Sequence, residues 1–90
     1  NLSVNDIDII EINEAFASQS IACLKDLGID QKKANLDGGA LALGHPLGAT
    51  GARITGKAAD LLRRENKKYA LSTQCIGLGM GIATIIESVN

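Results

Sequence analysis

A glycine-rich stretch, residues 36–53, constrains the fold of this 90-residue chain more than any other feature. It contains five of the ten glycines, together with the only histidine and the only proline, His45 and Pro46. Glycine lets the backbone take positive φ or approach a neighbour closely, and proline fixes φ where a helix can begin. We therefore expect a tight loop that leads into a helix.

His45 is a candidate for proton transfer, because an imidazole with its unperturbed pKa of about 6.5 changes charge near neutral pH. A histidine at such a junction can equally cap or fill the loop without taking part in chemistry. The residue alone leaves both interpretations open.

The residue pattern predicts an α/β fold with about three strands and two main helices. Runs rich in β-branched and apolar residues predict strands over residues 7–12, 69–75 and 80–87, and helical periodicity predicts helices over residues 14–27 and 48–64. A bend with two glycines separates the last two strands, which permits an antiparallel hairpin. We expect one domain without repeats or an internal linker.

Asn13 is expected to end the first strand and to act as N-cap of the first helix, because its short polar side chain suits that position. The apolar side chains of this helix fall on one face: Phe16, Ala17, Ile21, Cys23, Leu24 and Leu27. The second helix is expected to turn four residues inward: Ile54, Ala58, Leu61 and Leu62. Its first half is rich in alanine and glycine, which indicates close packing against a neighbouring segment.

The third strand, residues 80–87, is apolar on both faces, as is typical of a strand that is covered from both sides. Two helices cannot easily cover both faces of such a sheet. We therefore expect one sheet face to be exposed when this chain stands alone.

Composition and charge exclude several classes of partner. The net charge of −1 lacks the positive surface expected of a protein that binds nucleic acid. The apolar runs are too short to span a membrane and no leader opens the sequence, so we expect no membrane partner and favour a cytoplasmic location.

Cys23 and Cys75 lie far apart, which does not indicate a disulfide framework. The sequence starts at Asn1 without a methionine, and we expect it to be part of a longer protein.

Four places carry candidate chemistry: Asn13, His45, Cys75 and the glycine run that begins at Gly77. Three of them lie at predicted strand ends, where ligands collect in α/β sheets. Cys75 can be a structural residue, or a nucleophile or base beside His45, so a Cys/His hydrolase is one interpretation. Asn13 can hold a water against an oxyanion. Backbone amides near Gly77 can bind one directly, and one such donor is worth about 2.7–4 kcal/mol.

Two other patterns are rejected. Residues 51–58 spell Gly-x-x-x-x-Gly-Lys-Ala, which lacks the hydroxyl residue that a P-loop places on magnesium, so we expect no nucleotide there. Cys23, His45 and Cys75 include no closely spaced ligand pair, so we expect no metal site.

Three motifs occur in this order: Asn13-Glu14-Ala15-Phe16, Gly44-His45-Pro46 and Cys75-Ile76-Gly77. Together, at these intervals, they resemble the C-terminal motifs of thiolases, the acyl-CoA C-acyltransferases that include acetyl-CoA C-acetyltransferases and 3-ketoacyl-CoA thiolases. The resemblance runs from about residue 4 to residue 87 and includes the glycines around the histidine. It implies part of the layered α/β fold of the thiolase C-terminal domain.

The resemblance implies a role for each matching residue. His45 would activate a nucleophilic cysteine and, through its imidazole N–H, help to hold the thioester oxygen of the incoming acyl-CoA. Asn13 would fix the water that completes this oxyanion site. Cys75 would remove a proton from the α-carbon in Claisen condensation, or return one in thiolytic cleavage of a 3-ketoacyl-CoA.

The remaining implied roles concern the second oxyanion hole and the substrate. The amide of Gly77 would form half of that hole, and Ala15 and Phe16 would lie near the pantetheine arm of coenzyme A. Acyl-CoA and coenzyme A are thus implied as substrates in fatty acid metabolism, with no permanently bound cofactor. A homodimer or homotetramer is also implied.

One departure from the family pattern is decisive. Thiolases carry their nucleophile in an N-terminal Cys-x-Ser motif, which this sequence lacks, and the coenzyme-binding loop domain is missing too. We therefore expect residues 1–90 to be the C-terminal portion of a thiolase C-terminal domain, and to be inactive alone. The alternatives are a Cys/His hydrolase that uses Cys75 and a non-catalytic module that binds coenzyme A or lipid.

Overall fold

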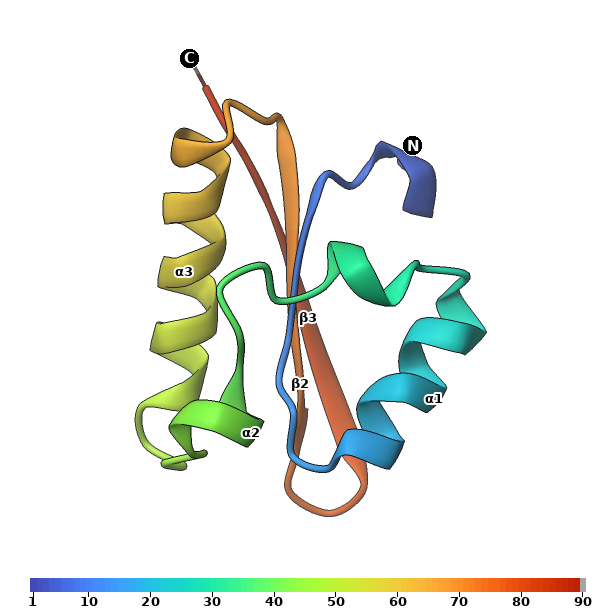
Figure 1. The fold of residues 1–90 in the computed structure, drawn as a ribbon, viewed down its shortest axis with the longest axis vertical. Helices are drawn as coiled ribbons and strands as arrows, with labels where there is room; N and C mark the ends of the chain where they lie inside the picture. The colour runs from blue at the N-terminus through green and yellow to red at the C-terminus, as the bar shows by residue number, and fades with distance from the viewer. Residues whose placement is uncertain (90) are drawn as a thin grey trace.

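The computed structural model describes residues 1–89 and contains a three-stranded sheet with helices on both sides (Figure 1). The predicted α/β class is confirmed. The strands and helices have these bounds: β1 Ile9–Ile12, α1 Ala17–Leu27, α2 Ala40–Leu43, α3 Thr50–Arg64, β2 Tyr69–Ile76 and β3 Met80–Glu87. Within residues 1–89, no helix has the length and apolar character needed to cross a membrane.

The sheet has the order β1-β2-β3 and is mixed. β1 runs parallel to β2, with Ile12 beside Thr73, and β2 forms the predicted antiparallel hairpin with β3. A parallel pair needs a long crossover, which here contains α1, α2 and α3. Because β1 and β2 are parallel, the C-terminal end of β1 and the hairpin turn after β2 lie at the same end of the sheet (Figure 1).

α3 covers one face of the sheet by packing on β1 and β2. The core beneath it contains Ile9, Ala58, Leu61, Leu62 and Ala70. All four inward positions predicted for this helix are buried. Truncation of one such leucine to alanine typically lowers the free energy of unfolding by about 2–5 kcal/mol. The packing of α3 therefore does much to hold the crossover on the sheet.

α1 covers the other face only in part. A buried cluster of Ile7, Ile10, Ile12 and Leu24 lies there, and Leu24 is the contribution of α1. Ile21 and Leu27 are exposed, as is Phe16, which precedes the helix and is 71% exposed. The predicted apolar face of this helix is therefore wrong in part, because residues 1–89 provide nothing that packs on its outer side.

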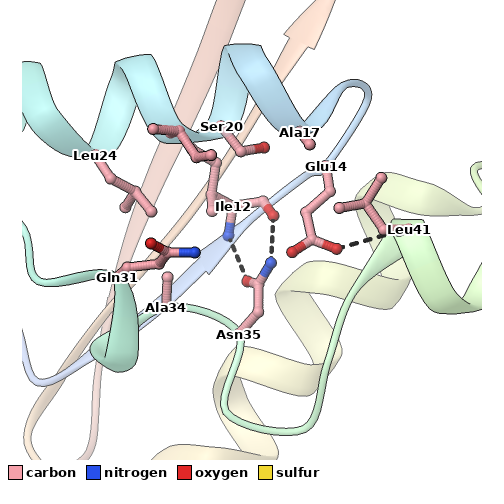
Figure 2. A pocket seen from close by; sticks show the side chains of 10 residues that line it. Ile12, Glu14, Ala17, Ser20, Leu24, Gln31, Ala34, Asn35 and Leu41 are labelled. Atoms are coloured by element: carbon pink, nitrogen blue, oxygen red, sulfur yellow. Dashed lines mark hydrogen bonds between the residues drawn. The ribbon is translucent and has the colours of Figure 1, made fainter.

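Asn35 closes the free edge of β1 (Figure 2). Its Oδ1 accepts a hydrogen bond from the Ile12 amide at 2.9 Å, and its Nδ2 donates to the Ile12 carbonyl at 2.8 Å, as a neighbouring strand would. Its own amide donates to the carbonyl of Ile10. The end of β1 is therefore held from both edges, by β2 on one side and by Asn35 on the other.

Glu14 joins the end of β1 to α2 (Figure 2). Its carboxylate accepts a hydrogen bond from the Leu41 amide at 3.1 Å. Gly39 lies against this contact, and a Cβ there would meet the Glu14 carboxylate and lie 2.8 Å from Nδ2 of Asn35. A side chain at this position would displace the Glu14 carboxylate and the Asn35 amide from these contacts, which gives one of the glycines before the histidine a structural reason.

The first helix begins at Ala17 rather than at residue 14, and the prediction that Asn13 is its N-cap is wrong. The Asn13 amide donates to the Thr73 carbonyl at 2.9 Å, so the parallel ladder continues one residue past β1. The chain then stays non-helical as far as Phe16, which is the N-cap. This longer extension leaves the side chain of Asn13 available for another contact.

The second helix begins at Thr50 rather than at residue 48, because a turn precedes it in which the Ala49 and Thr50 amides both donate to the Pro46 carbonyl. The short helix α2 lies between Gly39 and Gly44 and was not predicted, since four residues are too few to show helical periodicity.

The strand bounds differ from the prediction by one or two residues. β1 begins at Ile9 rather than at residue 7, because Ile7 ends a 3-10 turn. β2 continues to Ile76, which pairs with Met80, so the hairpin bend shortens to residues 77–79. β3 has the predicted bounds.

β3 is an exposed edge strand, which agrees with the expectation that this chain alone leaves a face of the sheet uncovered. Only Ile86 reaches the core beneath α3. Met80, Ile82 and Ile85 are 54%, 52% and 51% exposed. An apolar edge strand that lies open to solvent is a surface for pairing with further protein.

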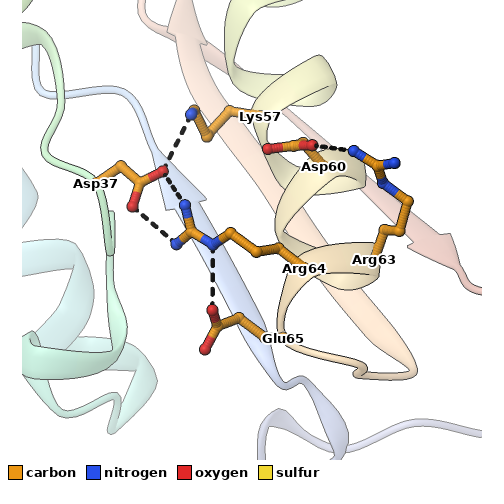
Figure 3. Close-up of polar contacts among 6 residues, drawn as sticks. All are labelled: Asp37, Lys57, Asp60, Arg63, Arg64 and Glu65. Carbon is orange, nitrogen blue, oxygen red and sulfur yellow. Dashed lines mark hydrogen bonds and ion pairs between the residues drawn. The ribbon is translucent and has the colours of Figure 1, made fainter.

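Asp37 ties the glycine-rich stretch to α3 (Figure 3). Its carboxylate accepts hydrogen bonds from Lys57 at 3.0 Å and from both terminal nitrogens of Arg64 at 2.7 and 2.8 Å. These bonds, chiefly from Arg64, hold the pKa of Asp37 well below its ordinary value. Exposed pairs contribute little to stability, but this one fixes where the stretch lies along the helix.

Glu11 is a buried acid in the middle of β1. It is 0% exposed, and neither carboxylate oxygen has a hydrogen-bond partner within residues 1–89. Alternate residues of a strand share a face, so its side chain lies with Ile9 under α3. Loss of hydration raises the pKa of Glu11 to about 7, although the charges of Arg53 and Lys57 oppose the shift. The ionised carboxylate therefore destabilises the fold.

We expect the chain to lose stability as the pH rises through the pKa of Glu11. The folded-state pKa of Glu11 is raised from 4.5 to about 7, so folding favours the neutral carboxyl. The stability gained from neutral Glu11 is complete below pH 4.5 and is lost above about pH 7. The loss is on the order of 3 kcal/mol. Urea unfolding at about pH 5 and about pH 8 measures it. Asp8 and Asp37, whose pKa values are lowered, lose their contributions only at more acidic pH.

Glu11→Gln should remove most of this pH dependence, whereas Glu65→Gln, at an exposed position, should retain it. The same pH dependence in the unchanged chain and in Glu11→Gln would contradict the assignment to Glu11.

Candidate active site

The predicted site residues gather at the end of the sheet where β1 and β2 finish. His45 comes from the glycine-rich stretch, and with Cys75 and Gly77 it lines a hollow of about 310 Å³. Asn13, directly after β1, contacts His45. The remaining lining residues are Leu47, Gln74 and Ile76. The topology thus brings together three motifs that lie far apart in the sequence.

Asn13 is 1% exposed, and its Nδ2 lies 3.3 Å from Nε2 of His45. Its Oδ1 is buried without a hydrogen-bond partner in the described chain. Such an unsatisfied group typically costs about 1–3 kcal/mol, which a residue that only filled space would not impose. The fold therefore loses stability by keeping the Asn13 side chain in contact with the imidazole of His45.

The imidazole of His45 is held at both nitrogens. Nδ1 lies 2.7 Å from Oγ1 of Thr50, and the Thr50 hydroxyl donates its hydrogen to the Pro46 carbonyl at 2.9 Å. The hydroxyl must therefore accept from Nδ1–H, which leaves Nε2 unprotonated in the neutral ring. Nε2 accepts from Nδ2 of Asn13. In this tautomer Nε2 is a base on the side of the ring that faces Asn13.

Cys75 and Gly77 present a thiol and a bare backbone to the same hollow. Cys75 pairs with Gly81 across the hairpin and is exposed, whereas Cys23 is only partly exposed. Gly77 opens the turn, in which Leu78 and Gly79 have positive φ. A Cβ at Gly77 would meet no atom within 4 Å, so the backbone here borders open space.

Cys75 also borders a second hollow of about 300 Å³ between α1 and the hairpin, together with Cys23, Leu27 and Met80. Cys75 therefore borders hollows on both sides of the hairpin. Within residues 1–89, no three His, Cys, Asp or Glu side chains form a cluster that could hold a metal ion.

Ala15 and Phe16 lie between β1 and α1, and neither lines the hollow that holds His45. Ala15 is half-buried, and Phe16 projects into solvent. Their predicted place beside the pantetheine arm of coenzyme A stays a prediction.

Thr50 and Glu11 are residues near the site that the sequence pattern did not single out. The only signal for Thr50 is a hydroxyl residue at a helix start, five residues after His45. The signal for Glu11 is an acid within an apolar strand, two residues before Asn13 and so on the same face. Neither signal is specific without the topology.

The chain belongs to the thiolase family, because the family model of the thiolase C-terminal domain matches residues 1–88. The resemblance seen in the three motifs is therefore confirmed. Its relatives include the 3-ketoacyl-CoA thiolase of Vibrio vulnificus strain YJ016, 56% identical over 89 residues, which are 96% of this chain and 23% of the relative. Another is the 3-ketoacyl-CoA thiolase of Salmonella typhimurium, 54% identical over 91 residues, with 98% and 24% covered.

Solved structures agree with the sequence relatives. Human mitochondrial 3-ketoacyl-CoA thiolase superposes with a TM-score of 0.95 at 52% identity, covering 99% of this chain and 23% of that one. The same human enzyme in complex with CoA gives a TM-score of 0.94 at 52% identity. The chain thus spans about a quarter of the length of the curated relatives it matches.

We expect Thr50→Val to release the tautomer of His45, because valine cannot accept from Nδ1–H. The ratio of the two neutral forms should change roughly fivefold, as for the loss of one hydrogen bond of ordinary net strength. Nitrogen NMR at alkaline pH measures it without overlap, since His45 is the only histidine. Thr50→Ser keeps the hydroxyl and should keep the ratio. An unchanged ratio in Thr50→Val would show that the threonine does not fix the ring.

Proposed function

We propose that this chain is the C-terminal part of a longer thiolase, which transfers acyl groups between coenzyme A thioesters. The reaction is Claisen condensation of two acyl-CoA molecules or its reverse, thiolytic cleavage of a 3-ketoacyl-CoA. The observation that carries the proposal is the contact of Asn13 with the unprotonated Nε2 of His45, next to the hollow that holds Cys75. Family membership and the coverage of about a quarter of each relative support it.

His45 serves first as a base and then as a donor. Nε2 takes the thiol proton of a nucleophilic cysteine supplied by the rest of the protein, and the thiolate attacks the acyl-CoA carbonyl. Coenzyme A leaves as its thiolate and takes the proton of the Cys75 thiol, which leaves Cys75 as a thiolate. Once protonated, Nε2–H donates to the thioester oxygen of the second acyl-CoA, and Nδ2 of Asn13 holds a water against the same oxygen. The contact of Nδ1 with the Thr50 hydroxyl supports this order of steps, because it keeps a proton on Nδ1 and so leaves the lone pair on Nε2.

Cys75 moves the carbon-bound proton. In condensation its thiolate removes a proton from the α-carbon of the second acyl-CoA, and the resulting carbanion attacks the acyl-enzyme carbonyl. In cleavage the Cys75 thiol returns a proton to that carbon. The amide of Gly77 donates to the acyl-enzyme oxygen. The position of Cys75 and Gly77 on one hollow with His45 supports these roles.

Coenzyme A is the natural ligand of such a site, as a substrate and not as a permanently bound cofactor. The solved human thiolase in complex with CoA supports this assignment. Ala15 and Phe16 would lie near the pantetheine arm, where exposed Phe16 offers an apolar contact.

The rest of the protein would cover the apolar surfaces that residues 1–89 leave open. These are the outer side of α1, with Ile21, and β3, with Met80, Ile82 and Ile85. An exposed apolar surface of this kind marks an interface. Its partners would be the N-terminal half with the nucleophile and, in a homodimer or homotetramer, a second subunit.

In the full-length gene product, His45→Ala and Cys75→Ala should each lower kcat for thiolysis by roughly 10²–10⁴-fold, because each removes a proton-transfer group. The release of product from a short 3-ketoacyl-CoA and coenzyme A measures it. Cys23→Ser changes a cysteine outside the His45 hollow and should retain activity. Full activity of either alanine variant would exclude the proposed roles.

Residues 1–90 alone should not turn over acyl-CoA above a His45→Ala control, because the nucleophile lies elsewhere in the protein. Incubation with acyl-CoA and mass mapping separates the alternatives. A Cys/His hydrolase would form an acyl adduct on Cys75, and a non-catalytic module would bind coenzyme A equally well with and without His45. Turnover by the isolated chain would contradict the proposal.

A further inference from the structure

The two residues on either side of Asn13 both bind the segment that leads to His45. Ile12, before it, binds Asn35 at the start of this segment through backbone hydrogen bonds of 2.9 and 2.8 Å (Figure 2). The residue after Asn13 binds the last part of the segment, just ahead of the histidine. The end of β1 therefore contacts this segment at three successive residues, and only the middle one has a part in the chemistry proposed above.

Glu14, which follows Asn13 directly, caps α2 from outside that helix. Its Oε1 accepts a hydrogen bond from the Leu41 amide at 3.1 Å (Figure 2). Leu41 is the second residue of α2, and an amide of the first turn has no partner within its own helix. The N-cap is Gly39, which has no side chain to supply one. The carboxylate of Glu14 therefore takes the place that a serine or aspartate cap usually fills.

α2 connects this anchor directly to the histidine. The helix is one tight turn, in which the Gly44 amide donates to the Ala40 carbonyl at 2.7 Å. His45 is the next residue, so a single peptide unit separates the turn from the residue that carries the imidazole. A shift of α2 would therefore move the ring relative to Asn13.

The segment also approaches the strand end closely, as this connection requires. A Cβ at Gly39 would meet the Glu14 carboxylate and lie 2.8 Å from Nδ2 of Asn35. Asn35 itself has a φ of 51°, in the left-handed region that asparagine tolerates better than most residues. The backbone thus turns toward the end of β1 at Asn35 and leaves no room for a side chain at Gly39.

We propose that Glu14 is a positioning residue, which holds α2 on the end of β1 and thereby sets the contact between Asn13 and His45. It acts through α2 and not on a substrate. Thr50 fixes the ring at Nδ1, whereas Glu14 fixes the backbone that leads into the histidine. The contact of 3.3 Å between Nδ2 of Asn13 and Nε2 is near the upper limit for a hydrogen bond, so a small shift of α2 breaks it.

Three variants of the full-length gene product test this role. Glu14→Ala removes the acceptor of the Leu41 amide, whereas Glu14→Gln keeps an oxygen that can accept from it. Asp30→Ala is the matched control. Asp30 also caps a short helix, by accepting from the Lys32 amide at 2.9 Å, and it does not line the hollow of His45.

Modification by diethyl pyrocarbonate, followed by mass mapping of the peptide that contains His45, measures how free Nε2 is. The reagent acylates an imidazole nitrogen with an available lone pair, and in the unchanged protein this lone pair accepts from Asn13. Glu14→Ala should raise the rate of modification roughly threefold to tenfold, as for the loss of one hydrogen bond of ordinary net strength. Glu14→Gln and Asp30→Ala should keep the original rate.

Thiolysis kinetics show whether the same bond matters for turnover. Glu14→Ala should lower kcat roughly threefold to tenfold with little change in KM, and Glu14→Gln should restore it. Asp30→Ala should retain kcat although it loses a cap of the same kind. If Glu14→Ala does not fold, Glu14→Met decides the question, because it fills a similar space without an acceptor.

An unchanged or lower rate of His45 modification in Glu14→Ala would overturn the positioning role, whatever the turnover. Equal rises in Glu14→Ala and Glu14→Gln, or in Glu14→Ala and Asp30→Ala, would also overturn it. The catalytic purpose of the role rests on the proposed function, but its effect on the Asn13–His45 contact does not. A raised rate of modification with unchanged turnover would therefore support the positioning role and count against the proposed use of that contact.

Discussion

The parallel pairing of β1 with β2 is the constraint on which the site depends. It places Ile12 beside Thr73, and the Asn13 amide adds one more ladder bond to the Thr73 carbonyl. A slip of one residue would turn Asn13 to the opposite face of the sheet, away from His45. The register is secured on both sides, by the core under α3 and by Asn35, which occupies the other edge of β1 as a strand would.

The imidazole of His45 then joins two elements, the end of β1 and the start of α3. Asn13 belongs to the end of the first strand, and Thr50 belongs to the first turn of α3. After β1 the chain passes through α1 before it reaches His45. The glycine-rich stretch then returns the chain to the end of β1, where the ring meets Asn13. A ring fixed at both nitrogens has one tautomer and one orientation, and general base catalysis requires both.

Sequence pattern predicted the features that depend on local periodicity or on spacing. The inward face of α3 was predicted correctly, because the partner of that helix lies within the chain. Of the apolar face predicted for α1, only Leu24 is buried and Cys23 partly buried against the core, because nothing in residues 1–89 packs on the rest. Asn13 was misread as a helix cap because capping propensity is local, while its observed partner lies 32 residues away. Thr50 and Glu11 gain meaning only once the crossover is known.

The polar groups of the site weaken the fold that carries them. Glu11, Asn13 and Thr50 occupy buried positions that apolar residues would otherwise fill, and the first two leave oxygens without partners. Their cost falls on a small core, while β3 and the outer side of α1 expose apolar side chains. Burial of apolar surface contributes roughly 25 cal/mol per Å². Packing of further protein on β3 and on the outer side of α1 would therefore offset the stability lost by burying polar residues at the site. The fold can carry these polar residues because its exposed apolar surfaces allow that packing.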